Sequence, residues 1–257
     1  MTVELLVLAG VVGLMIGSFL NVCIGRIPAG ESVVSPGSRC PSCRTPIAWY
    51  DNIPVLSYAL LGGRCRKCRR PISMRYPAVE LVTAAAFVLQ ASVFGDEPWL
   101  LASRLVLTAI LIVLFGTDFD TQRLPDVLTL PGIAIGLAGS LFLPPGIWDS
   151  LVGTALGAGI LLAIRWVWLR LKGVDAMGLG DVKMLAMIGA FLGWKQVWVV
   201  LVLASFAGAI IGIGLTMARG RSMQSRLPFG TFLALAAYVA SLWGDRLVAW
   251  YLELSGI

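Results

Sequence analysis

Residues 105–117 read Leu-Val-Leu-Thr-Ala-Ile-Leu-Ile-Val-Leu-Phe-Gly-Thr, and the next residue is Asp118. This run ends an apolar segment, residues 99–117, whose length suits a helix that crosses a bilayer. The whole chain has the same character: it is 58% hydrophobic and 13% charged, with a mean hydropathy of +0.87. Soluble domains carry about 25% charged residues. The sequence therefore predicts an all-α polytopic membrane protein.

Apolar segments long enough to span a membrane recur along the chain. We expect about eight transmembrane helices, at residues 4–24, 77–94, 99–117, 127–143, 150–169, 182–193, 197–217 and 229–252. The sixth is the weakest, because Lys183 and Lys195 leave only about a dozen apolar residues between them. It could be a short tilted span, or one arm of a re-entrant hairpin with the seventh. The first lacks the basic start of a signal peptide, so we expect it to stay in the mature protein.

The 20 Lys and Arg residues are distributed unevenly between the two sides that eight spans define. Nine of them fall in residues 26–75 and later loops on that side add more, whereas the opposite side receives only Lys195 and Arg246. Basic loops stay in the cytoplasm. We therefore expect residues 26–75 to be cytoplasmic. We expect the same of the two helix ends that carry Asp118 and Asp181. The net charge of +6 follows from this bias and needs no nucleic-acid partner.

The one sizeable polar segment, residues 25–76, contains two Cys-x-x-Cys pairs. They are Cys40-Pro-Ser-Cys43 and Cys65-Arg-Lys-Cys68. Each pair places two thiolates on a tight turn, and four thiolates complete a tetrahedral, zinc-ribbon-like site. Disulfides are the alternative, but they rarely persist in the cytoplasm. We expect a structural zinc ion, because four cysteines leave no open coordination position and a segment of about 50 residues with few large apolar side chains needs such a staple.

Two aspartates stand where a membrane protein tolerates charge least. Asp118 ends the third apolar segment, and Asp181 precedes the sixth in Gly178-Leu-Gly180-Asp181-Val-Lys183. A carboxylate in or near a bilayer is costly and points to function. Two carboxylates that approach each other can share a proton and activate water, as in aspartic proteases. The glycines allow close backbone approach, and Lys183 can contribute a charge near the site.

Structural interpretations compete with this one. Asp181 could simply cap the helix that follows it, and Gly-x-Gly-Asp alone is a weak motif. Asp126 could cap the fourth apolar segment in the same way. Asp120 could be solvated at the interface or could pair with Arg123. Of the three acids between residues 118 and 126 we expect one, Asp118, to be catalytic, because it lies closest to the end of its apolar segment.

Glu80 is a further ionisable residue in an apolar setting, because it lies just inside the second span in Arg75-Tyr76-Pro-Ala-Val-Glu80. It could pair with Arg75, or it could bind a substrate or cofactor. The chain contains no His, which excludes Ser-His-Asp and Cys-His catalysis and His-Glu-x-x-His zinc sites. Acid–base chemistry must then fall to other residues, and this favours an aspartyl mechanism.

Short motifs occur in a fixed order along nearly the whole chain. Besides the two cysteine pairs they are Gly17-Ser-Phe-Leu-Asn-Val22, Arg26-Ile-Pro28, Asn52-Ile-Pro54, Ser57-Tyr58, Arg75–Glu80, Asp118-x-Asp120, Leu124-Pro-Asp126-x-Leu-Thr-Leu-Pro131, Gly178–Lys183 and Pro228-Phe-Gly230. In this order they resemble the bacterial type IV prepilin peptidases, membrane aspartyl proteases that mature type IV pilins and type II secretion pseudopilins. There are two small departures: Gly25 stands where an aromatic residue is common, and Thr231 where a proline is common.

The resemblance implies that Asp118 and Asp181 are the catalytic pair. It implies that the leaders of prepilins and pseudopilins are removed on the cytoplasmic side of the bacterial inner membrane, by a multi-pass protein embedded in the lipid bilayer. Five further residues are expected to support the active site; they are Gly178, Gly180, Lys183, Asp120 and Asp126.

The resemblance also implies a second activity, N-methylation of the new amino terminus with S-adenosylmethionine, which is associated with the cytoplasmic loop. Arg75, Tyr76 and Glu80 are the candidates for contact with the methyl donor or the substrate. We expect three domains: a first transmembrane helix at residues 1–24, a cytoplasmic tetra-Cys zinc-binding domain at 25–76, and a transmembrane helical peptidase domain at 77–257.

Two other functions are compatible with acids at helix ends. One is an ion- or proton-coupled transporter with the zinc-ribbon segment as a regulatory loop, although transporters often show internal repeats and we find none here. The other is a non-enzymatic membrane scaffold that uses the zinc ribbon for docking. Neither alternative predicts proteolysis of a leader-bearing substrate, so that reaction separates all three.

Overall fold

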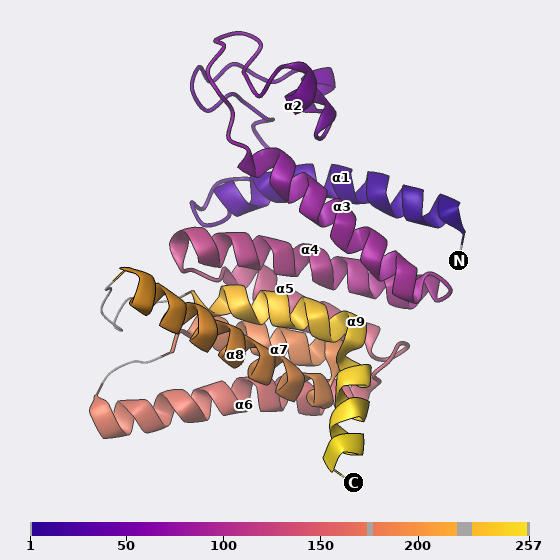
Figure 1. The fold of residues 1–257 in the computed structure, drawn as a ribbon, viewed down its shortest axis with the longest axis vertical. Helices are drawn as coiled ribbons and strands as arrows, with labels where there is room; N and C mark the ends of the chain where they lie inside the picture. Colours follow the sequence, from indigo (N-terminus) through magenta and orange to yellow (C-terminus); the bar gives the residue numbers. More distant parts are fainter. Residues whose placement is uncertain (1, 174–176, 220–227, 256–257) are drawn as a thin grey trace. The chain divides into compact units, whose positions relative to one another are not determined.

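The computed structural model describes residues 2–173, 177–219 and 228–255, and within these residues the fold is all-helical (Figure 1). The helices are α1 (Val3–Arg26), α2 (Leu56–Leu60), α3 (Arg75–Phe94), α4 (Pro98–Thr121), α5 (Asp126–Gly139), α6 (Ile147–Lys172), α7 (Leu179–Leu192), α8 (Trp194–Arg219) and α9 (Phe229–Ser255), with a 3-10 turn, η1, at Trp49–Asn52. The chain forms two compact units, Met1–Val113 and Leu114–Ile257.

Each of the eight predicted apolar segments contains a helix, but the helices are not all of spanning length. Six described helices are long and apolar enough to cross a membrane: α1, α3, α4, α6, α8 and α9. By contrast, α5 and α7 have 14 residues each, about 21 Å of helix, against an apolar layer of about 30 Å. The expectation that α5 continues to residue 143 is wrong, since the helix ends at Gly139 and turns lead into Pro144 and Pro145. Eight complete spans therefore stay a prediction.

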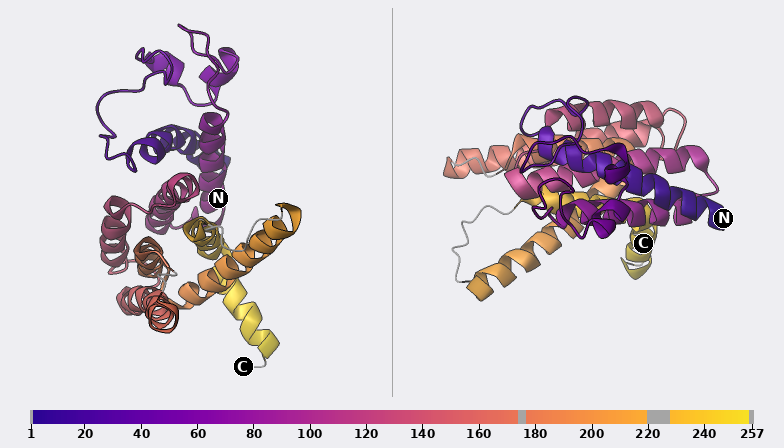
Figure 2. Two further views of the ribbon diagram at one scale, coloured as in Figure 1. Left: turned by 90° about the vertical axis from the view of Figure 1, so that its left-hand side faces the viewer. Right: turned by 90° about the horizontal axis from the view of Figure 1, so that it is seen from above.

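In the first unit, α1 and α3 pack along each other (Figures 1 and 2). Two glycines of α1 make this close approach possible. A Cβ atom at Gly13 would lie 2.6 Å from the Ala84 backbone, and one at Gly17 would lie 2.7 Å from the Cα of Glu80. Small residues at such positions let helices associate in lipid. The packing also fixes Glu80 beside the polar segment that connects α1 to α3.

In the second unit, α7 is the central helix. It contacts α5, α6, α8 and α9, and every residue from Met184 to Leu192 is buried. A helix that is apolar on all sides belongs inside a bundle. Glycines make room for it, because a Cβ atom at Gly157 of α6 would lie 2.5 Å from the Leu185 carbonyl oxygen. This burial explains why the weakest predicted span still forms a helix: its neighbours cover it.

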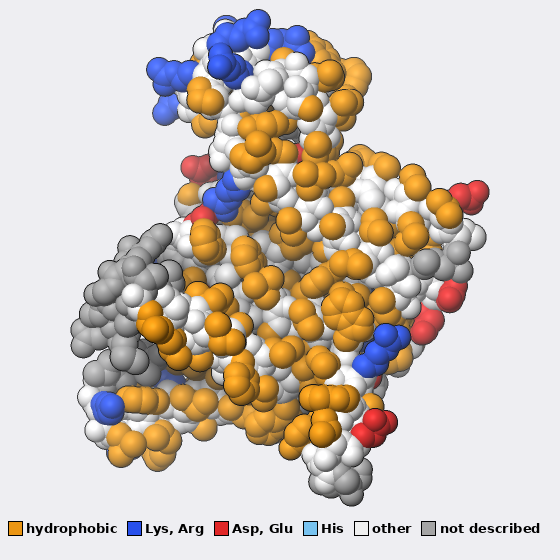
Figure 3. Space-filling view, in the orientation of Figure 1, with side chains coloured by type: hydrophobic (Ala, Val, Ile, Leu, Met, Phe, Trp, Pro, Cys, Tyr) orange, Lys and Arg blue, Asp and Glu red, His pale blue; other side chains and the backbone are white. Residues whose placement is uncertain are grey.

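The outer helices of the second unit present apolar side chains to their surroundings. Among the most exposed are Trp148 and Leu171 on α6 and Ile210 and Met217 on α8, and Figure 3 shows hydrophobic side chains over these helices. Apolar surface of this extent suits lipid contact. In the first unit, Lys and Arg side chains gather on the segment between α1 and α3 (Figure 3).

Candidate active site and candidate metal centre

Asp118 lies in the last turn of α4 and is only 4% exposed. Its Oδ2 atom accepts a hydrogen bond from the Thr231 backbone N–H at 2.7 Å and another from the Thr231 hydroxyl at 3.1 Å. Thr231 stands in the first turn of α9, where backbone N–H groups lack acceptors inside the helix and the helix dipole favours negative charge. The start of α9 thus compensates the buried carboxylate.

Asp181 lies in the first turn of α7 and is partly buried. Asp181 is not the N-cap residue itself, because Gly178 holds that position and Asp181 is the third residue of α7. The Asp181 carboxylate does accept a hydrogen bond from the Gly178 backbone, as in a capping box, and it also interacts electrostatically with Asp118. The two aspartates predicted from the sequence are therefore neighbours, and each meets the start of a helix.

Leu124 is a residue of this site that sequence reasoning did not single out. A Cβ atom at Gly180 would lie 2.8 Å from Leu124 Cβ, and one at Gly230 would lie 2.9 Å from Leu124 Cδ1. The turn after α4 and the starts of α7 and α9 thus meet around one side chain. These contacts explain why positions 180 and 230 are glycines. A larger residue at either position would have to displace Leu124.

Lys183 and Asp126 form an ion pair that joins α7 to α5. The Lys183 Nζ atom lies 2.7 Å from both carboxylate oxygens of Asp126. The interpretation of Asp126 as a helix cap is wrong, since Pro125 occupies the N-cap position and Asp126 is the first residue of α5. Asp120 lies on the exposed surface two residues after Asp118. Of the predicted supporting residues, Gly178, Gly180 and Lys183 therefore lie around Asp181, while Asp126 joins them through Lys183.

The four cysteines of the two Cys-x-x-Cys pairs meet in the first unit. Their sulfur atoms all lie within 4.8 Å of one another, so the group can hold a metal ion. The Cys40 and Cys68 sulfurs are 3.8 Å apart and those of Cys43 and Cys65 are 4.0 Å apart, whereas a disulfide needs about 2.05 Å. Tetrahedral zinc–thiolate bonds of about 2.3 Å place sulfurs about 3.8 Å apart. In the structure these four cysteines are therefore free thiols and form no disulfide bonds.

The two cysteine turns repeat one geometry. Arg44 donates its backbone N–H to the Cys40 carbonyl, and Arg69 does the same to Cys65, at 2.9 and 3.0 Å. Both arginines have positive φ angles, 56° and 58°. This left-handed conformation lets the chain reverse direction directly after each cysteine pair. Hydrogen bonds between the Cys43 thiol and the side chain and backbone of Thr45 lower the pKa of this thiol to about 6, which favours the thiolate that binds metals.

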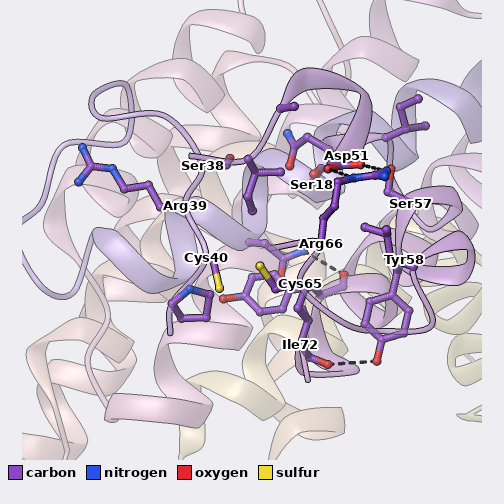
Figure 4. A pocket seen from close by; sticks show the side chains of 18 of the residues that line it. Ser18, Ser38, Arg39, Cys40, Asp51, Ser57, Tyr58, Cys65, Arg66 and Ile72 are labelled. Carbon is purple, nitrogen blue, oxygen red and sulfur yellow. Dashed lines mark hydrogen bonds and ion pairs between the residues drawn. The ribbon is translucent and has the colours of Figure 1, made fainter. Parts of the chain in front are cut away.

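A cavity of about 630 Å³ lies in the same unit, between the cysteine segment and the facing ends of α1 and α3 (Figure 4). Its lining includes Glu80, Tyr76 and Asn52, but Arg75 does not line it. Glu80 is 7% exposed and its Oε2 accepts the Val55 N–H at 2.8 Å. The Ser18 side chain also bonds this carboxylate.

The lining of this cavity contains a strained backbone position and a two-bond ion pair. Val55 holds a φ of +59°, a strained conformation for a β-branched residue, and such strain concentrates at functional sites. Asp51 receives two hydrogen bonds from Arg66 at 2.8 and 2.6 Å (Figure 4). This guanidinium holds the pKa of Asp51 below its usual range. The cavity thus has carboxylates, an amide and aromatic rings in its lining.

Comparison with known proteins agrees with this arrangement. Residues 11–94 match the model of the Bacterial Peptidase A24 N-terminal domain, and residues 105–213 match that of the Type IV leader peptidase family. Proteins called prepilin leader peptidase/N-methyltransferase are similar over most of their length. The one from Aeromonas salmonicida strain A449 is 39% identical, over 93% of this chain and 91% of its own, and the one from Pseudomonas aeruginosa is 37% identical, over 95% and 92%.

A protein of the same name from Myxococcus xanthus is 43% identical over 82% of this chain and 63% of its own. No solved structure matches the chain. The relatives match across both compact units, and both family models fall on the segments that carry the cysteine cluster and the aspartates. The chain therefore belongs to the type IV leader peptidase family.

Proposed function

We propose that this protein is a membrane aspartyl endopeptidase that removes the leader peptide of type IV prepilins or pseudopilins and then N-methylates the new amino terminus. The observation that carries the peptidase is the neighbouring pair Asp118 and Asp181, each at a helix end. Family membership and the names of the relatives support both activities. They favour neither a transporter nor a scaffold.

The two carboxylates carry out the hydrolysis as one unit. One of them is ionised and takes a proton from water, whose oxygen attacks the scissile carbonyl carbon. The other is protonated and donates its proton to the carbonyl oxygen. The C–N bond then breaks and the departing nitrogen takes up a proton, which leaves a free amino terminus on the mature chain. Because protons of such a pair belong to both groups, two macroscopic ionisations describe it.

The decisive test is cleavage of a prepilin-type substrate by the purified protein in lipid or detergent. We expect a shortened product with a new amino terminus, identified by mass spectrometry. Several substrates with a basic leader and an apolar helix should be tried, because the pilin is not specified. A folded protein with metal in its cysteine site that cleaves none of them would contradict the proposal.

Lys183 and Asp126 support the site by fixing α7 against α5. The pair is partly solvated, with side chains 32% and 56% exposed, so its contribution to stability is about 0–1 kcal/mol. We therefore expect Lys183→Met to lower kcat for cleavage by about tenfold with little change in Tm, since a small displacement of Asp181 is costly. The exchange Asp126→Lys with Lys183→Asp should recover part of the loss. Equal kcat values for Lys183→Met and wild type would contradict this role.

A structural Zn²⁺ held by Cys40, Cys43, Cys65 and Cys68 completes the proposal for the first unit. The sulfur separations and the four-thiolate donor set fit zinc. With no open position for water, the ion stabilises residues 25–76 rather than the reaction. We keep the division into residues 1–24, 25–76 and 77–257 as a functional one, with this zinc domain between a first helix and the peptidase.

The methyl donor S-adenosylmethionine fits the cavity beside the cysteine segment. The donor carries a positive sulfonium and an amino group, and its methyl group is electrophilic. The buried Glu80 carboxylate would attract these charges, Asn52 would offer hydrogen bonds, and Tyr50 or Tyr76 would cover the adenine ring. The volume of about 630 Å³ lies in the range of small-molecule sites. Of the candidates from the sequence, Glu80 and Tyr76 keep this role and Arg75 is the weakest.

Replacement of Glu80 tests the donor site by binding rather than by activity. We expect Glu80→Gln to weaken binding of S-adenosylmethionine by about tenfold or more, because a hydrogen-bonded charge is lost. Equilibrium dialysis with labelled donor measures this directly. Glu31→Gln, on an exposed residue of the same segment that does not line the cavity, is the matched control. Unchanged donor affinity in a folded Glu80→Gln protein would exclude this cavity.

The distribution of basic residues leads us to propose an orientation of the protein in the bacterial inner membrane. The cysteine segment and the ends that carry Asp118 and Asp181 face the cytoplasm, where basic residues concentrate. Substrate leaders are basic and approach from that side, and their apolar helices reach the site through the lipid. Labelling of single introduced cysteines with a membrane-impermeant reagent, in intact cells and in inverted vesicles, tests this orientation.

A further inference from the structure

Thr231 holds Asp118 in an unusual way, because both of its donors reach one oxygen. The backbone N–H lies 2.7 Å from Oδ2 and the hydroxyl lies 3.1 Å from the same atom. Thr231 is itself 6% exposed, so water does not compete freely for these bonds. The short N–H···O distance is typical of a hydrogen bond to a charged acceptor.

The arrangement decides which oxygen of Asp118 can carry a proton. A backbone N–H can only donate, so Oδ2 must act as an acceptor at this position. A proton on Oδ2 would leave that oxygen fewer lone pairs for the two Thr231 donors, so the hydroxyl would have to turn away. A proton on Oδ1 keeps both Thr231 bonds intact, so the arrangement favours Oδ1 for any proton that Asp118 takes from water or shares with Asp181.

The start of α9 lies close against Asp118 and Leu124. A Cβ atom at Gly230 would lie 3.0 Å from both Cγ and Oδ2 of Asp118 and 2.9 Å from Leu124 Cδ1. The start of α9 can approach the carboxylate only because residue 230 is glycine. A proline at position 231, common in the resembling family, would have neither an N–H nor a hydroxyl. This chain thus contains a pair of donors that a proline cannot supply.

We propose that Thr231 is a positioning residue for Asp118, which fixes Oδ2 as an acceptor and leaves Oδ1 as the oxygen that exchanges protons during cleavage. The inference rests on the proposed peptidase function and adds to it the atom that carries the proton. Among the described residues, Asp181 on α7 interacts electrostatically with this carboxylate, the Lys183–Asp126 pair joins α7 to α5, and exposed Asp120 follows Asp118 on α4. Within the described first turn of α9 there is no acid.

The test compares Thr231→Val, Thr231→Ser and Thr231→Pro in the full-length protein, with cleavage of a prepilin-type substrate as the assay. Thr231→Val loses one donor and should lower kcat about tenfold with KM unchanged. Thr231→Ser keeps both donors and should return kcat to within about twofold of wild type. Thr231→Pro loses both and should be slower than Thr231→Val.

The control is Thr154→Val, which removes a hydroxyl bonded only to the Ser150 carbonyl of its own helix; its kcat should match that of wild type. Metal content and thermal unfolding identify any variant that fails to fold. If an active wild type is matched by Thr231→Val, or if Thr231→Ser is as slow as Thr231→Val, the positioning role is wrong. A wild type that cleaves no substrate overturns the proposed function, and this inference falls with it.

Discussion

Asp118→Asn should reduce leader cleavage by about 10³-fold or more, the contribution of a general acid or base placed at the reacting atoms. Asparagine has nearly the shape of aspartate, and its amide oxygen can still accept from Thr231. It cannot take or give the proton that the reaction needs. Loss of activity would therefore report chemistry rather than misfolding. The product is quantified by mass spectrometry under single-turnover conditions, so that substrate binding is measured separately.

Asp181→Asn should cause a loss of similar size, because the two carboxylates act as a unit and such losses are not additive. The double variant should be no slower than either single one by more than a few fold. Asp149→Asn, in the first turn of α6, is the control for removal of an acid elsewhere in the same unit. If Asp118→Asn retains more than about a tenth of wild-type cleavage while folded, Asp118 is not a catalytic residue.

Cys65→Ser should lower the metal content from about one ion per chain to nearly none, since tetrahedral binding depends on all four thiolates. The segment that they hold has little core of its own. Among its large apolar side chains, Val34, Trp49 and Leu60 are 85%, 81% and 77% exposed. Without metal we expect residues 25–76 to lose their structure, because metal binding supplies the folding free energy of such small domains.

The effect on the two activities should differ. Binding of S-adenosylmethionine should fall strongly, since the cavity lining includes Cys40 and Cys65 and the turns around them. The rate of leader cleavage should fall less. Elemental analysis gives the metal content, and limited proteolysis at the basic residues of the segment reports its order. Cys23→Ser, at a buried cysteine of α1 outside the cluster, should keep full metal. A Cys65→Ser protein with an undiminished metal content would refute the four-thiolate site.

Local patterns in the sequence were enough to predict the helices and the main chemical groups. Hydropathy over about 20 residues depends on neighbours in the chain, so each of the eight predicted segments contains a helix, although among the described residues six of these helices are long enough to span. The paired Cys-x-x-Cys spacing predicted the metal cluster, because each pair is a self-contained turn. The absence of His directed acid–base chemistry toward Asp118 and Asp181. The clearest error lies at a helix end, since α5 ends at Gly139 and not at residue 143.

The partners of these groups were decided only by the tertiary structure. Thr231 is 113 residues from Asp118, Lys183 is 57 from Asp126, and Val55 reaches Glu80 through a loop. No periodicity links such positions, since each contact depends on how closely two helices can approach.

That approach depends in turn on glycines such as Gly180 and Gly230, whose steric role is visible only once Leu124 stands against both. By itself the sequence determined which segments are helical and which atoms can do chemistry, because hydropathy and side-chain functional groups are local properties. Only the tertiary structure decided which donor meets which carboxylate oxygen, because that follows from packing over long sequence separations.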